Sequence, residues 1–141
     1  MSELLKRFER IVRGSKAPAE SDTGAKGAIH PFDERNIHPD IAKGALKLFD
    51  DGHYAQATFE AFKYIDTLVS TISGIGKSGV GLMMAAFPEK SPPIQLTPLT
   101  NTTERDEQSG FQFMFAGSAS GIRNPRGHVV NMPDPIDLCL D

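Results

Sequence analysis

The sequence lacks the features of secreted and membrane proteins. It has one cysteine, Cys139, so no intramolecular disulfide can form, and no CxxC metal motif is present. No stretch approaches the roughly 18 consecutive apolar residues that would span a bilayer. Residues 1–13 also lack the apolar centre of a signal peptide. We therefore expect a cytoplasmic protein without a membrane span or a disulfide.

An excess of positive charge is also absent. The 141 residues include 15 Lys and Arg against 18 Asp and Glu, which gives a formal net charge of −3. Bulk attraction to nucleic acid is therefore not indicated, and any contact with RNA must depend on a local basic cluster. The four histidines, His30, His38, His53 and His128, show no metal-ligand spacing with one another or with Cys139. We expect no metal and no cofactor.

Large apolar residues are missing from the segment GSKAPAESDTGAKGA, residues 14–28. Such a segment cannot bury enough apolar surface to offset chain entropy, so we predict a mobile linker over residues 14–27. An amphipathic helix is predicted over residues 2–13. The chain then divides into residues 1–37, an N-terminal helix and flexible linker, and a domain over 38–141. The folded body is predicted to begin near Ile29 or His38.

Helical periodicity begins at Pro39. Apolar residues recur at steps of three and four along residues 39–51, 54–72 and 103–122, and a glycine-weakened helix is predicted over 77–87. Gly52 stands where a C-terminal cap belongs, and Thr103 with Asp106 resembles a capping arrangement. No convincing alternating pattern of a strand is present. We predict an all-α bundle of about four to five helices.

The fifth helix is predicted to begin at Asp134 and Pro135, a capping residue followed by a first-turn proline. It is short, because the chain ends at Asp141. Two interpretations stay open. Either this helix completes itself against a partner, or the domain is a C-terminally shortened version of something longer.

The sequence GIGKSG at residues 74–79 matches the GxGxxG pattern of dinucleotide-binding loops. That fingerprint must follow a strand, whereas residues 54–72 are predicted to be helical. We therefore interpret GIGKSG as a helix–helix connection, with nucleotide binding as the weak alternative. His30, His38 and His53 are interpreted as capping or packing residues near helix starts.

Three basic side chains crowd into the sequence RNPRGH, residues 123–128. Asn124 precedes a proline, so the fourth helix is predicted to end near Arg123, and Gly127 allows the backbone a close approach. Arg123 on the last turn and His128 beyond the kink would then face the same side.

The chemistry of these side chains suits a phosphodiester. Arginine clamps phosphate by charge and planar geometry, histidine exchanges protons near neutral pH, and Asn124 adds an uncharged hydrogen-bond donor. On spacing alone, a solvated turn in which Arg123 favours a helix C-terminus is the stronger interpretation.

A resemblance changes this balance. Arg123, four residues and then His128 at the end of a helix is similar to the R-x(4–6)-H motif of the HEPN superfamily, whose members include metal-independent endoribonucleases. The polar residue after the arginine, here Asn124, is typical as well. Over roughly residues 38–141 the chain more closely resembles the Ymh family, prokaryotic proteins related to HEPN domains and often found in phage-defence contexts. The segments that carry this resemblance are HPDIAKGALKLFDDGHYAQATFEAFKYID (38–66), GVGLMMAAF (79–87), EQSGFQFMFAGSASGIRNPRGH (107–128) and DPIDLCL (134–140).

The resemblance implies a HEPN-like helical bundle that cleaves RNA without a metal. The 2′-hydroxyl of the RNA would attack the adjacent phosphorus, leaving a cyclic phosphate and a free 5′-hydroxyl. His128 would handle the proton, Arg123 would stabilise the phosphorane charge, and Asn124 would orient the phosphate or His128. Arg126 and Arg105 would track the RNA backbone.

Partners follow from the same resemblance and from the fourth helix. We expect a homodimer, because the run FQFMF (111–115) carries more apolar side chains than one helix face can bury. The resemblance also implies an antitoxin or another defence-system protein as partner. Related toxins carry a tyrosine two residues after the histidine, where this chain has Val130, which argues against control by tyrosine modification. The alternative from another class is a non-catalytic helical module that binds RNA or a protein partner.

Overall fold

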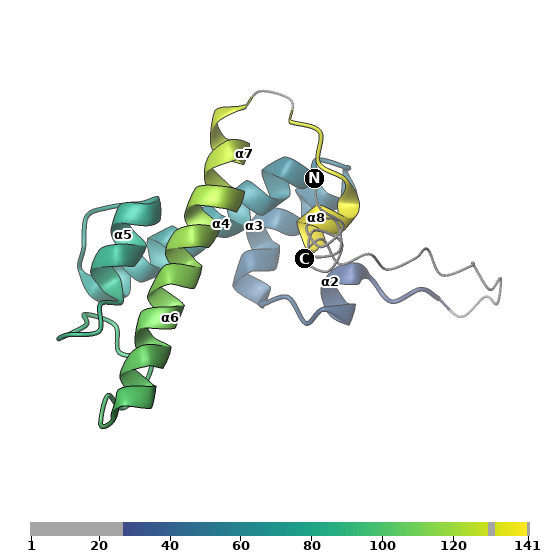
Figure 1. The fold of residues 1–141 in the computed structure, drawn as a ribbon. Helices are drawn as coiled ribbons and strands as arrows, with labels where there is room; N and C mark the ends of the chain where they lie inside the picture. The colour runs from purple at the N-terminus through teal and green to yellow at the C-terminus, as the bar shows by residue number, and fades with distance from the viewer. Residues whose placement is uncertain (1–26, 130–131, 141) are drawn as a thin grey trace, which may run out of the picture.

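The computed structural model describes residues 27–129 and 132–140 (Figure 1). Every regular element in these two ranges is a helix, which confirms the predicted all-α fold. The predicted helix over residues 2–13, most of the predicted linker and Val130 lie outside the described residues. No helix in the described ranges has the length and apolar character that a membrane span requires. In chain order the elements are α2 (Pro31–Glu34), α3 (Pro39–Asp50), α4 (Tyr54–Ser73), α5 (Gly79–Ala86), α6 (Thr102–Ser118), the π-helix η1 (Ala119–Arg123), α7 (Asn124–His128) and α8 (Ile136–Leu140).

Helices α3 and α4 pack against each other across a short turn. Gly52 in this turn has a φ of +81°, a left-handed conformation that glycine adopts without strain. Leu140 of α8 packs against the apolar cluster between the two helices, so the end of the chain covers this pair. The buried members of that cluster are Phe32, Ala45, Phe49 and Ala57.

Two His-Pro pairs begin α2 and α3 in the same way. The Nδ1 atom of His30 accepts a hydrogen bond from the Phe32 N–H at 3.1 Å, and Nδ1 of His38 accepts one from the Asp40 N–H at 3.2 Å. Both histidines are therefore N-caps, as predicted, whereas His53 occupies the N-cap position of α4 without a side-chain capping bond. The ring of Phe32 is buried with Phe49 and Ala57, so α2 packs into the same apolar cluster as α3 and α4.

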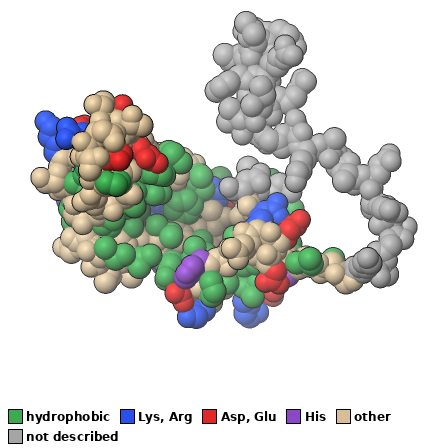
Figure 2. All heavy atoms as spheres, turned by 90° about the horizontal axis from the view of Figure 1, so that it is seen from below, with side chains coloured by type: hydrophobic (Ala, Val, Ile, Leu, Met, Phe, Trp, Pro, Cys, Tyr) green, Lys and Arg blue, Asp and Glu red, His purple; other side chains and the backbone are tan. Residues whose placement is uncertain are grey.

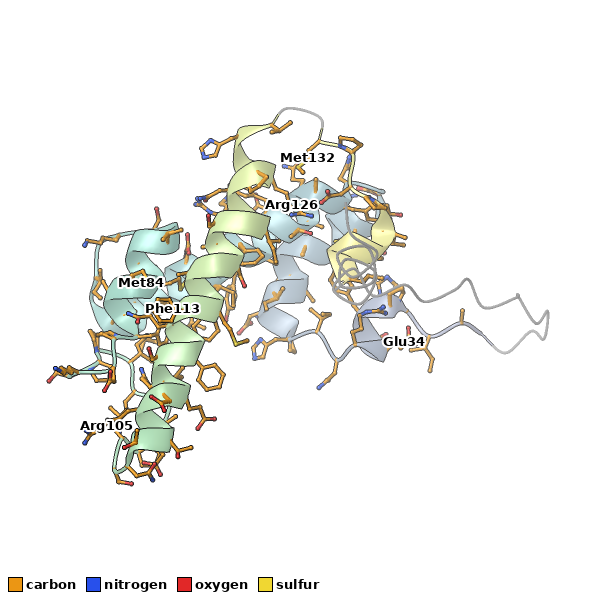
Figure 3. The ribbon with its side chains drawn as sticks, viewed as in Figure 1. Glu34, Met84, Arg105, Phe113, Arg126 and Met132 are labelled. Carbon is orange, nitrogen blue, oxygen red and sulfur yellow. The ribbon has the colours of Figure 1, made fainter. Side chains whose placement is uncertain are left out.

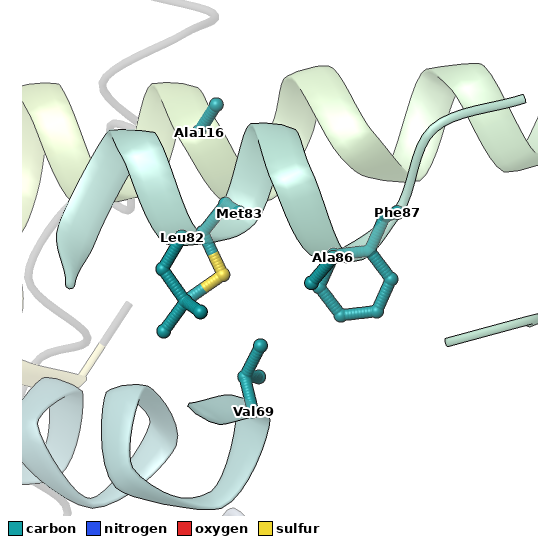
Figure 4. Close-up of a cluster of buried hydrophobic side chains, with 6 residues drawn as sticks. All are labelled: Val69, Leu82, Met83, Ala86, Phe87 and Ala116. Carbon is teal, nitrogen blue, oxygen red and sulfur yellow. The ribbon is translucent and has the colours of Figure 1, made fainter. Parts of the chain in front are cut away.

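A second apolar cluster joins α4, α5 and α6 (Figure 4). The GIGKSG segment links α4 to α5, and partly buried Ile75 packs against this cluster while its carbonyl accepts a hydrogen bond from the Ser70 hydroxyl at 2.7 Å. The segment is thus a packed helix–helix connection in the described structure. The buried members of the cluster are Val69, Leu82, Met83, Ala86, Phe87 and Ala116.

Helix α6 holds the proline-rich loop before it through a fully buried glutamine. The Gln108 side-chain amide donates to the carbonyls of Phe87 and Ile94, at 3.3 and 3.0 Å, and its oxygen accepts from the Leu96 N–H at 2.8 Å. The polar side chain is buried at little cost because each of its groups is paired.

The start of α6 differs from the prediction. Asn101, not Thr103, is the N-cap, and its side chain accepts from the Glu104 N–H at 3.0 Å. Glu104 in turn accepts from the N–H and hydroxyl of Thr100, each at 2.7 Å. The predicted pairing of Thr103 with Asp106 was wrong because the asparagine two residues earlier has the stronger capping geometry.

The predicted end of the fourth helix near Arg123 was also wrong, because helical backbone continues through Pro125 to His128. In an α-helix the ring of Pro125 would clash with the carbonyl four residues earlier. The π-helix widens the chain just before this point, and the Asn124 N–H donates to the carbonyl of Ala119, five residues back. This wider turn accommodates the proline without a break.

Candidate active site

Arg123, the last residue of the π-helix, extends toward α4. Its Nη2 atom lies 3.5 Å from Oδ2 of Asp66, and its Nη1 atom donates to Oδ1 of Asn124 at 3.1 Å. The Arg123 side chain is 21% exposed and that of Asp66 only 11%. The guanidinium is therefore held in place from two sides, with part of its surface open to solvent.

The first residue of α5 completes this polar cluster. The Gly79 N–H donates to the same Asp66 oxygen at 3.0 Å. Gly79 has a φ of +58°, and a Cβ built there would lie 3.7 Å from Nη1 of Arg123. The Asp66 carboxylate thus ties α4, α5 and the π-helix together.

Phe59 forms the apolar support of the cluster. Cζ of Arg123 lies 5.4 Å from the centroid of the Phe59 ring, within the range of a cation–π interaction. A Cβ on Gly127 would come within 2.7 Å of Cε2 of the same ring. The predicted close approach at Gly127 is confirmed, and the group that comes close is the Phe59 ring.

One donor of the guanidinium is unpaired among the residues that the structure describes. Nε of Arg123 is buried and makes no hydrogen bond within the described part of the chain. A buried unpaired donor costs about 1–3 kcal/mol. The site therefore holds Arg123 at some expense in stability.

His128 does not join this cluster. It is the last residue of α7, it is exposed, and no hydrogen bond connects its imidazole to another described residue. His128 is five helical positions after Arg123, which places the two side chains about 140° apart around the helix axis. The kink that was expected to turn both to one side is absent, so the structure joins Arg123 to Asn124 but not to His128.

The two arginines predicted to bind RNA lie far apart. Figure 3 shows Arg126 and Arg105 toward opposite ends of the continuous α6–α7 rod. Arg105 is exposed in the first turns of α6. The Arg126 side chain is 7% exposed, its Nε atom donates to Oδ2 of Asp134 at 2.5 Å, and Nη1 donates to the Ile122 carbonyl at 2.8 Å. Two nitrogens of the Arg126 guanidinium, Nε and Nη1, are thus already hydrogen-bonded within the protein.

Sequence reasoning missed Asp66, Phe59 and Gly79. Asp66 carried a usable signal, because it is an acidic residue on the apolar side of a long helical pattern, between Ile65 and Val69. A buried carboxylate is seldom found without a cationic or N–H partner. Phe59 and Gly79 carried no such signal. Among the described residues, no group of three or more His, Cys, Asp or Glu is arranged to hold a metal ion.

The family model Hypoth_Ymh, described as a protein of unknown function, matches residues 35–137. The chain belongs to the Hypoth_Ymh family. The matched region of this Hypoth_Ymh chain begins just after α2 and contains Asp66, Gly79 and the whole of RNPRGH. Comparison with curated proteins and with solved structures gave no match.

Proposed function

We propose that this protein is a metal-independent endoribonuclease of the HEPN type. The observation that supports the proposal most directly is the fixed Arg123 guanidinium, which is held by Asp66 and Asn124 and partly open to solvent. The exposed imidazole of His128 lies one short helix away. A fixed planar cation and a free imidazole are the two groups that transesterification of RNA requires.

The proposed reaction uses the RNA's own nucleophile. The 2′-hydroxyl loses its proton and attacks the adjacent phosphorus, the bond from phosphorus to the 5′-oxygen breaks, and that oxygen takes up a proton. The products are a 2′,3′-cyclic phosphate and a free 5′-hydroxyl. His128 moves the proton, Arg123 neutralises the extra charge of the phosphorane, and Asn124 orients the phosphate or His128.

Binding of the RNA strand uses local positive charge, since the chain is acidic as a whole. Arg105 is exposed and contacts phosphates at the far end of α6. Arg126 contacts the RNA beside the reacting phosphate through Nη2, the guanidinium nitrogen that its bonds to Asp134 and Ile122 do not use.

A second copy of the chain covers the exposed face of α6. Phe113 and Met114 on this face are 62% and 64% exposed, and a Cβ at Gly110 or Gly117 would meet nothing within 4 Å. Each mid-helix glycine costs about 0.5–1 kcal/mol relative to alanine, and no contact in the described structure accounts for these two. In Figure 2 hydrophobic side chains cover the middle of the face that is shown, with charged groups toward its edges.

An antiparallel arrangement of two α6 helices suits this surface. It sets the large side chains of one copy, Phe113 and Met114, against the glycines of the other, so the face is complementary to itself, as a twofold dimer requires. The stretch between Glu107 and Arg123 has no charged residue, which also favours an interface. The dimer brings two RNPRGH segments into one assembly.

The biological setting of the proposal is a prokaryotic cytoplasm, in a phage-defence or toxin-like system with an antitoxin or another defence protein as partner. A second function, a non-catalytic helical module that binds RNA or protein, has one observation in its favour. Arg123 is paired with buried Asp66 and lies away from His128, as a purely structural arginine would.

Cleavage of RNA in the presence of EDTA tests the proposal. The full chain should produce fragments with 2′,3′-cyclic phosphate and 5′-hydroxyl ends, and the chelator should not slow the reaction. Loss of cleavage in EDTA contradicts the mechanism. Binding of RNA without any cleavage supports the non-catalytic alternative.

A further inference from the structure

A cavity of about 430 Å³ lies beside the RNPRGH segment, between α4 and the chain that follows α7. One wall is formed by the start of α4, and the other by Arg126, Gly127 and the residues that lead to α8. Gly127 and Val129, the two neighbours of His128, both line it. The volume falls within the range of small-ligand sites.

The polar groups of the α4 wall share one side of the helix. His53, Gln56 and Glu60 are spaced by three and four residues, so their side chains point the same way. The Glu60 carboxylate has one described partner, Lys63, whose Nζ atom lies 3.0 and 3.1 Å from its two oxygens. Such a surface pair is weak, and a ligand with better-placed N–H groups can displace it.

The opposite wall contains the buried pair of Arg126 and Asp134. Nη2 of Arg126 makes no hydrogen bond to any part of the chain that the structure describes, whereas Nε and Nη1 both do. The cavity thus offers a cationic donor on one side and a carboxylate with two acceptors on the other.

This charge pattern selects a nucleobase over a phosphate. Of the lining residues, the single guanidinium of Arg126 is already paired with Asp134, so an anion would lose its hydration without an unpaired lining cation to bind it. A neutral heterocycle with both donors and acceptors meets no such penalty.

Among the RNA bases, guanine matches these groups best. Its N1–H and N2–H donate side by side to a carboxylate, and its O6 and N7 accept from a guanidinium. Adenine and cytosine place a ring acceptor beside their amino group, and uracil has a single N–H, so none of these three satisfies both oxygens of Glu60. We propose that this cavity binds a guanine base of the RNA strand, and this inference rests on the proposed ribonuclease function.

Two experiments on the full chain test the guanine site. In the first, ¹H–¹⁵N NMR spectra are recorded with guanosine 5′-monophosphate and with adenosine 5′-monophosphate at equal concentrations. The guanine nucleotide should shift the Gln56 side-chain amide and the Gly127 amide, and the adenine nucleotide, which carries the same phosphate, should not. Equal shifts, or none, overturn the proposal.

In the second experiment, cleavage is compared on short RNAs that differ at one base. Wild type should prefer guanine next to the cleaved bond, and Glu60→Gln should reduce that preference about tenfold or more. The matched control Lys63→Gln removes the neighbour of Glu60 and should keep the preference. Thermal unfolding checks that both variants fold. If Glu60→Gln does not fold, Gln56→Ala, at an exposed position that also lines the cavity, replaces it and should likewise reduce the preference for guanine.

The outcomes separate the two proposals. Guanine-specific shifts in a protein that does not cleave RNA support the cavity as a site for a free guanine nucleotide and count against the ribonuclease. Cleavage without base preference, together with equal response to both nucleotides, leaves the ribonuclease intact and overturns the guanine site.

Discussion

Arg126 and Asp134 form a buried ion pair that fastens the segment before α8 to α7. The Asp134 side chain is 1% exposed, and its carboxylate would be strongly destabilised there without its partner. The pair therefore holds together the side of the cavity that faces α4.

Removal of one member of this pair should destabilise the protein severely. We expect Arg126→Met to lower the free energy of unfolding by about 3–5 kcal/mol, because it leaves a buried carboxylate unpaired. The double variant Arg126→Met, Asp134→Leu should recover much of that loss. Chemical denaturation measures both, and equal stability of the single variant and wild type would show that the pair is open in solution.

Substitution of His128 should separate catalysis from folding. His128→Ala should slow RNA cleavage by roughly 10²–10⁴-fold, the range of a proton-transfer group. Its melting temperature should stay close to that of wild type, because the side chain is exposed. RNA binding should weaken less than turnover, because the histidine acts mainly in the transition state. Unchanged cleavage would remove His128 from the mechanism.

Arg123 should need its planar fork as well as its charge. Arg123→Ala should impair cleavage as severely as His128→Ala. Arg123→Lys should not restore it, because lysine cannot contact Asn124 and a phosphate in one plane. Single-turnover rates measure the effect, and full rescue by lysine would show that charge alone is required.

Asp66 should act through Arg123 as a positioning residue. Asp66→Asn keeps an oxygen that can accept from the Gly79 N–H but removes the charge that faces Arg123. We expect a loss of about 1–3 kcal/mol in stability and a fall in kcat larger than any rise in KM, since the phosphorane needs a fixed guanidinium. If kcat is unchanged while stability falls, Asp66 has a structural role only.

The exposed face of α6 should control oligomerisation. Gly117→Leu should shift the protein from dimer to monomer, because the new side chain occupies the open space over Gly117 that a second α6 would enter in the proposed dimer. Gly44→Leu on α3, where a Cβ also meets nothing within 4 Å, is the matched control and should leave the dimer intact. Sedimentation at micromolar concentration gives the mass, and a wild-type mass of one chain would rule out this interface.

The helices of this protein were largely predictable, and the reason is visible at Gly52 and along α4. Repeated apolar residues at steps of three and four require a helix, and a glycine that can adopt a positive φ marks its end. The caps of α2 and α3 were also predictable, since each histidine stands directly before a proline. Such signals are local and need no knowledge of the fold.

The site was only partly predictable, because its contacts join residues that are far apart in the sequence. RNPRGH could be found because its residue types and spacing are unusual, but Asp66, which pairs with Arg123, lies 57 residues earlier, and Gly79, which donates to Asp66, lies 44 residues earlier. Their proximity depends on how α4 and α5 pack. The π-helix was missed because a proline in sequence favours a helix end, and only the wider turn before it shows why the helix continues here.

That wider turn has a consequence for how this site can change. The π-helix holds one residue more than an α-helical path of the same rise, so it sets the phase of α7 relative to α6. Deleting a single residue from 119–123 would restore an α-helical path and leave α7 facing α4, but it would remove the wider turn, and the ring of Pro125 would then clash with the carbonyl four residues earlier. The face of α6 that packs against the apolar cluster would stay the same. The proposed catalytic residues are therefore joined to the core by one short segment, whose wider turn lets helical backbone continue through Pro125.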